Sequence, residues 1–138
     1  LIDEASGWYD QGGGDVDSRH NYFYPLRIRP GGRTVALSEY GGIAWPMPGH
    51  EPPGKTYGYG TAKDKADLTK RYKMLQWKTI LPQLGRGLSA LVYTQLTDVE
   101  DEVNGLFTYD RVALKPEAAA VRSCNAALAA EFAKVTAK

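Results

Sequence analysis

One carboxylate, Glu39, stands where an apolar run meets a glycine-rich turn, a placement that suits a catalytic nucleophile. Residues 35–37 read Val-Ala-Leu, which predicts a short buried strand, and glycines at positions 41 and 42 end it. Parallel α/β barrels place their catalytic groups at the carboxyl ends of buried strands. The same spacing also fits a strand-end glutamate that caps the next element or faces water.

Residues 45–60 are rich in proline and glycine and carry three aromatic side chains, those of Trp45, Tyr57 and Tyr59. Such a segment forms neither a helix nor an inner strand, and long loops of this kind are usually functional or disordered. Tryptophan and tyrosine offer flat faces that stack against the C–H faces of sugars. We therefore predict a carbohydrate-binding loop, with the alternative that Trp45 simply packs the loop onto the domain.

The chain has 138 residues and a net charge of +1, with acidic and basic residues interspersed. This length fits one domain with a hydrophobic core and is too short for a complete (β/α)8 barrel, which needs roughly 250 residues. We expect no nucleic-acid partner, because there is no basic stripe, and no membrane span, because there is no apolar run of about 18 residues. Since the chain opens on Leu1, we expect the native N-terminus upstream and leave the compartment open.

Hydrophobic periodicity predicts an α/β fold of parallel strands with flanking helices. Segments that match strands lie at residues 1–5, 16–24, 35–37 and 88–96. The last of these is apolar at nearly every early position, which predicts a strand buried on both faces. Helices are predicted over residues 63–84 and 117–135, each burying one apolar stripe.

The stripe of the first helix includes Met74 and Trp77, and that of the second includes Cys124 and Phe132. Cys124 is the only cysteine, so the chain has no intramolecular disulfide and no multi-cysteine metal site, and we interpret it as a core thiol.

We expect neither a metal nor a cofactor. His20 and His50 lack the paired spacing of metal ligands, and the acidic residues at 98–102 lack the order of a calcium loop, which favours a solvated acidic rim. The glycines at 12–14 lack the lysine and serine of a phosphate-binding loop, and no serine stands in a G-x-S-x-G motif.

Four segments together resemble glycoside hydrolase family 2, which contains β-galactosidases, β-glucuronidases and β-mannosidases. They are Ser-Gly-Trp-Tyr-Asp-Gln-Gly-Gly-Gly-Asp at 6–15, Asp-Ser-Arg-His-Asn-Tyr at 17–22, Ser-Glu-Tyr-Gly-Gly-Ile-Ala-Trp at 38–45, and Val-Tyr-Thr-Gln-Leu-Thr-Asp-Val-Glu-Asp-Glu-Val-Asn-Gly-Leu-Phe-Thr-Tyr-Asp-Arg at 92–111. They occur in the family's order. The resemblance implies a partial (β/α)8 TIM barrel over residues 1–138, covering about strands five to eight of the catalytic domain.

The resemblance also implies roles for individual residues. Glu39 corresponds to the catalytic nucleophile at the end of strand seven, and Tyr22 to the strand-six tyrosine that hydrogen-bonds it. Tyr93 falls where family members often carry a strand-eight tryptophan that lines the sugar subsite. Pocket-lining positions are implied for His20, Asn21, Trp45 and Gln95.

The chain departs from the family in two places. The family's acid/base glutamate follows an asparagine, and no Asn-Glu pair occurs in this sequence. Where β-glucuronidases carry Asn-Lys-Lys-Gly to bind the sugar carboxylate, this chain reads Glu-Val-Asn-Gly at 102–105. A second carboxylate buried beside Glu102 would be costly, which favours a neutral sugar.

These observations predict part of a retaining β-glycosidase, β-galactosidase-like, which acts on terminal β-linked sugars and is inactive as this chain alone. The alternative is a non-catalytic α/β module that binds carbohydrate. A partial barrel leaves unpaired strand edges and an apolar inner face, with Val35, Leu37, Leu91 and Val92 among its residues. We therefore expect the chain to form a homo-oligomer.

Overall fold

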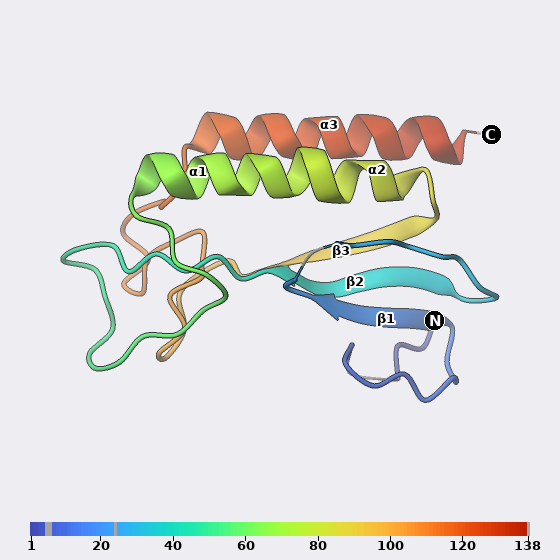
Figure 1. Ribbon diagram of the computed structural model, residues 1–138, viewed down its shortest axis with the longest axis horizontal. Helices are drawn as coiled ribbons and strands as arrows, with labels where there is room; N and C mark the ends of the chain where they lie inside the picture. Colours follow the sequence, from blue (N-terminus) through green and yellow to red (C-terminus); the bar gives the residue numbers. More distant parts are fainter. Residues whose placement is uncertain (5–6, 24, 138) are drawn as a thin grey trace.

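The protein is an α/β structure built on a short parallel sheet. The computed structural model describes residues 1–4, 7–23 and 25–137. In this part of the chain the sheet has three strands, β1 (Val16–Asn21), β2 (Thr34–Gly41) and β3 (Leu88–Thr94), in the order β1-β2-β3 and all parallel (Figure 1). The α/β class is confirmed. The sheet is open and does not close into a barrel, and it has one strand fewer than the four segments predicted.

The core lies between one face of the sheet and a layer of helices. Val35 and Leu37 on β2 are 1% and 0% exposed, so the apolar run at the centre of the sheet is buried as predicted. They pack in one cluster with Leu68, Leu75 and Ile80 from the helical layer. Burial of this apolar surface is the main force that holds the helices on the sheet.

The first helical segment is a single rod with three hydrogen-bonding patterns. α1 (Lys65–Met74) begins at Asp64, whose side chain accepts a hydrogen bond from the Asp67 backbone at 2.8 Å. It continues into a π-helical segment, η1 (Leu75–Ile80), and ends as α2 (Leu81–Leu84). Pro82 has no N–H and its ring crowds the preceding turn, and the Leu81 N–H bonds to Gln76 in the wider register. The predicted helix is therefore present but is not a uniform α-helix.

The second helix, α3 (Ala118–Thr136), lies beside α1 and α2 over the same face of the sheet (Figure 1). Cys124 is 1% exposed, as predicted for a core thiol. The predicted burial is wrong for three other residues of the two apolar stripes. Phe132 is 39% exposed, and on the first helical segment Met74 and Trp77 are 54% and 41% exposed. The helices form a single layer, so one side of that layer faces water.

The prediction that the strand at residues 88–96 is buried on both faces is also wrong. Val92 in β3 is 57% exposed, because the described helices cover only one face of the sheet (Figure 1). Residues 1–4 form no strand, and Ile2 instead pairs with Asp15 in the loop before β1. The remaining residue of that predicted strand, position 5, lies outside the described residues, as does position 24 at the end of the second.

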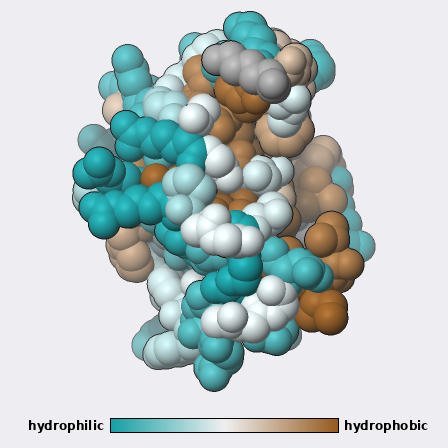
Figure 2. All heavy atoms as spheres, turned by 90° about the vertical axis from the view of Figure 1, so that its right-hand side faces the viewer, coloured by the Kyte–Doolittle hydropathy of each residue, from teal (hydrophilic) through white to brown (hydrophobic). Residues whose placement is uncertain are grey.

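Two long loops, residues 42–64 and 95–117, gather at the carboxyl ends of the strands (Figure 1). Viewed from the opposite end of the sheet, the surface is mostly hydrophilic, with smaller hydrophobic areas between the polar groups (Figure 2). No helix in the described residues is long and apolar enough to cross a membrane. The two loops and the strand ends beside them contain most of the predicted site residues.

A buried ion pair anchors the second loop. Lys115 Nζ lies 2.7 Å from Asp98 Oδ1, and their side chains are 0% and 2% exposed. The Lys115 ammonium also donates to the Val103 carbonyl at 2.9 Å, and the Gly105 N–H donates to Asp98 at 2.7 Å. Burial raises the pKa of Asp98 and lowers that of Lys115. The predicted solvated acidic rim is wrong for Asp98, which is an internal structural group.

Candidate functional site

Glu39 lies near the carboxyl end of β2, opposite His20 of β1. The strand register shifts between Arg19 and His20 on one side of β2, and between Leu37 and Tyr40 on the other. Irregularities of this kind re-aim side chains and are frequent beside active sites. The Glu39 side chain is 42% exposed, so its carboxylate is accessible from solvent.

A tyrosine from the neighbouring strand end binds this carboxylate directly. The Tyr22 hydroxyl donates to Glu39 Oε2 at 2.5 Å and lies 3.2 Å from Thr94 Oγ1 at the end of β3. Burial and the hydrogen bond to Glu39 raise the pKa of Tyr22 well above its usual value. The phenol therefore stays protonated at neutral pH and keeps donating its hydrogen bond to Glu39.

His20 adds a second group beside the same carboxylate oxygen. Its Nδ1 lies 3.2 Å from Glu39 Oε2, within ion-pair distance, and its side chain is 12% exposed. The angle is not that of a hydrogen bond, and Nδ1 has no hydrogen-bond partner in the described residues. The Trp8 ring meets the His20 ring edge-on with centroids 5.4 Å apart. The imidazole is thus held between Trp8 and the Glu39 carboxylate, with its Nδ1 atom buried.

The other predicted site residues occupy different surroundings. Trp45 is 8% exposed and belongs to the hydrophobic core, the alternative left open from the sequence. Tyr93 packs edge-on against Tyr40 and Tyr72, at 5.5 and 5.3 Å, between the sheet and the helices. The Asn21 side-chain oxygen accepts from the Phe23 N–H at 3.0 Å and thereby shapes the chain after β1. The structure thus gathers His20 and Tyr22, and not these three, at the Glu39 carboxylate.

Gln95 takes part in a polar network with two residues of the second loop. Its Nε2 donates to Glu102 Oε2 at 3.0 Å and to Asn104 Oδ1 at 2.8 Å. The Asn104 amide donates to the same Glu102 oxygen at 3.2 Å, and Asn104 itself is 1% exposed. Glu102 is therefore held by neutral amides, with no cationic side chain bonded to it in the described residues.

Tyr59 is one of the three aromatic residues that the sequence analysis named in the first loop, but it was given no individual role there. Its ring stacks on that of Tyr22 with centroids 3.9 Å apart. A hydrogen bond with Tyr57, together with burial and the nearby charges of Glu102 and Glu39, raises the pKa of Tyr59 to about 12. Tyr59 is therefore close enough to both carboxylates to feel their charge, and its ring packs on that of Tyr22.

The signal that could have identified Tyr59 was the aromatic content of the loop, but the sequence does not say which ring turns inward. Thr94 and Trp8 were also missed, since a threonine at a strand end and a loop tryptophan are individually common. Within the described residues no three His, Cys, Asp or Glu side chains come together as metal ligands.

No known protein-family model matches the chain, and a search of curated proteins found no match either. An accessible carboxylate that receives a phenol hydrogen bond, beside an aromatic cluster, can act as a nucleophile or can bind the hydroxyl groups of a ligand.

Proposed function

We propose that this chain carries the nucleophile and part of the sugar site of a retaining β-glycosidase that resembles glycoside hydrolase family 2. The observation that carries the proposal is the 2.5 Å hydrogen bond from Tyr22 to Glu39 across two adjacent parallel strand ends. The resemblance assigned these two residues to the nucleophile and its tyrosine partner. That assignment requires the two side chains to be in contact. They are in contact although the two residues are 17 positions apart in the sequence.

In this mechanism the ionised Glu39 attacks the anomeric carbon, and the bond to the leaving oxygen breaks as the glycosyl–Glu39 ester forms. A protonated carboxyl group on the other side of the bond transfers its proton to the leaving oxygen. The same group then removes a proton from the water that hydrolyses the ester. The Tyr22 hydrogen bond orients the Glu39 carboxylate for the first step.

The acid/base group of this mechanism is to be supplied from outside the chain. No Asn-Glu pair occurs in the sequence. We accordingly propose that the three parallel strands and their helices are one part of a (β/α)8 barrel, and that the chain by itself does not turn over glycosides. The open sheet with one uncovered face supports this view.

The neighbourhood of Glu39 favours a neutral sugar, β-galactoside-like in class. Exposed aromatic side chains near it, Trp8 and Tyr57, are each 48% accessible and can stack on the C–H face of a sugar ring. Glu102 and its amide partners accept and donate hydrogen bonds as sugar hydroxyls require. An anionic sugar would meet the negative charges of Glu39 and Glu102, and no lysine or arginine of the described residues forms an ion pair with either carboxylate.

The second candidate is a carbohydrate-binding module without catalysis. It is favoured by the same missing acid/base carboxylate, since binding needs only the aromatic and polar groups. The two functions differ in whether Glu39 forms a covalent bond with the sugar.

The test uses a 2-deoxy-2-fluoro-β-galactosyl fluoride, whose activated leaving group lessens the need for an acid catalyst. We expect mass spectrometry of the treated chain to find one fluorosugar ester, located on the peptide that contains Glu39. Glu39→Gln should carry no ester, and Glu131→Gln on α3 should be labelled like the parent. Binding without labelling would favour the module, whereas Glu39-dependent hydrolysis of an aryl β-galactoside by this chain alone would contradict the missing acid/base group.

A further inference from the structure

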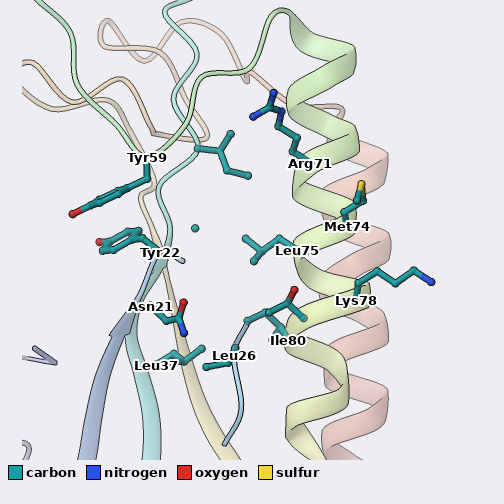
Figure 3. A pocket seen from close by; sticks show the side chains of 13 residues that line it. Asn21, Tyr22, Leu26, Leu37, Tyr59, Arg71, Met74, Leu75, Lys78 and Ile80 are labelled. Atoms are coloured by element: carbon teal, nitrogen blue, oxygen red, sulfur yellow. The ribbon is translucent and has the colours of Figure 1, made fainter. Parts of the chain in front are cut away.

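A cavity of about 370 Å³ lies on the helix side of the sheet (Figure 3). Leu37 of β2 and the aromatic ring of Tyr22 face it from the sheet. Leu75, Met74 and Ile80 face it from the helical layer. Its volume lies within the range of about 300–1,000 Å³ typical of small-molecule sites, and apolar side chains dominate its walls.

The wall on the helix side is the irregular part of the first helical segment. Leu75, Lys78, Thr79 and Ile80 line the cavity, and all four belong to η1. π-helical segments are rare and frequently occur at functional sites. The wider turn therefore forms much of the helical wall of the cavity, and Arg71 and Met74 of α1 complete it.

The cavity has cationic side chains and no carboxylate among its lining residues. Arg71 lies at one end of it, while Lys78 extends away from it (Figure 3). The Arg71 Nε donates to Asp67 at 3.0 Å, and its two Nη groups make no hydrogen bond to the described residues. These Nη groups can bind an incoming carboxylate in a charge-assisted, bidentate pair.

Glu39 is not among the described residues that line the cavity. The rings of Tyr22 and Tyr59 line the cavity, and their hydroxyl groups point away from it (Figure 3). Tyr22 thus contacts both, with its hydroxyl on Glu39 and its ring facing the cavity. A compound that fills the cavity would press on the back of the ring that holds the proposed nucleophile.

We propose that this cavity binds an amphipathic carboxylate, with its hydrocarbon part against Leu26, Met74 and Leu75 and its carboxylate on Arg71. A neutral hydrocarbon would gain no charged contact from the Arg71 Nη groups, and a cation would be repelled by Arg71 and Lys78. The walls of the cavity can contact a hydrocarbon chain of moderate length, and Arg71 at one end can contact one charged group. The site goes beyond the glycosidase proposal and does not depend on it.

The test measures binding of decanoate to the 138-residue chain by calorimetry, below the concentration at which decanoate forms micelles. Decanol and decyltrimethylammonium have the same hydrocarbon chain with neutral and cationic ends. We expect decanoate to bind roughly tenfold more tightly than decanol, because one charge-assisted hydrogen-bonded contact is added, and the cation to bind most weakly. Equal affinities for the three compounds, or no binding of decanoate, would overturn the proposal.

Variants locate the bound compound. Arg71→Met should remove the preference for decanoate over decanol, while Lys70→Met, at an exposed lysine outside the cavity lining, should keep it. Leu75→Trp should fill the cavity and abolish binding of both compounds. Because Leu75 is buried, Met74→Trp serves as a second filling variant at a half-exposed position. Unchanged decanoate binding in folded Arg71→Met, or in folded Met74→Trp, would also overturn the proposal.

Discussion

The rings of Tyr22 and Tyr59 stack 3.9 Å apart, and the backbone of Gly42 lies against both of them. A Cβ atom at Gly42 would come within 2.8 Å of each ring, closer than real side chains approach. Gly42 also has φ of +63°, which L-residues other than glycine rarely adopt. The glycine after β2 is therefore needed for the aromatic stack, and through Tyr22 for the hydrogen bond to Glu39.

Gly42→Ala should destabilise the protein by about 1–3 kcal/mol, because the new methyl group meets two rings and the backbone conformation is strained. Urea denaturation measures the loss, and near-ultraviolet circular dichroism should report a change in aromatic packing. Gly31→Ala is the matched control, since no atom lies within 4 Å of its Cβ position and its φ is not positive. Equal stability of the two variants would show that the stack tolerates a side chain.

The local sequence pattern correctly predicted which face of an element is apolar and turns inward. The run at 35–37 forms the buried centre of β2, and Cys124 is buried on α3, because one apolar period defines each inward face. The exposure of Val92, Trp77 and Phe132 could not be predicted in this way, because it depends on which faces other elements cover. The pattern marks an apolar face, and only the assembled layers determine whether that face is buried.

The site was predictable to a similar degree. Residue types and the resemblance selected Glu39, Tyr22 and His20, which the structure places together. They could not show that Trp45 turns into the core, or that Gln95 pairs with Glu102, because both outcomes depend on how the loops fold over the strand ends. Loop conformation is set by tertiary hydrogen bonds, and these leave no periodic signal in the sequence.

Lys115→Met should destabilise the protein by about 3–5 kcal/mol, because it leaves the carboxylate of Asp98 buried without its cation. Urea denaturation measures the effect. The double variant with Asp98→Asn should recover part of the loss, since the uncompensated charge is then removed. Lys134→Met is the control: its ion pair with Glu131 is exposed, and such pairs contribute about 1 kcal/mol or less. A loss as small as that of the control would show that the buried pair does not anchor the loop.

Alkaline titration should separate the tyrosines of the interior from free tyrosine. Burial raises the pKa of Tyr22, Tyr40 and Tyr72, with the Glu39 hydrogen bond adding to the effect for Tyr22. A raised pKa means that the folded state holds the proton more tightly. The resulting stabilisation is complete below about pH 10, the unfolded value, and is lost as pH rises through the folded value.

Tyrosinate absorbance measured against pH should therefore show tyrosines that ionise above about pH 10 in the native protein and near pH 10 in urea. Tyr22→Phe should remove one of the late-ionising groups and leave those of Tyr40 and Tyr72. Full ionisation of every tyrosine near pH 10 in the folded protein would contradict the burial of these phenols.

The uncovered side of the sheet should lead to self-association. Val92 and Leu96 are 57% and 67% exposed, and in the described residues β1 and β3 each pair only with β2, so both outer edges of the sheet are open. Open edges and exposed apolar surface favour pairing with a second chain, at about 25 cal/mol per Å² of apolar area buried. Sedimentation at increasing micromolar concentration should show a dimer or larger species. Val92→Lys should weaken it, whereas the same change at Val112, which is 75% exposed outside the sheet, should not. A monomer at every concentration would show that this face is stable in water.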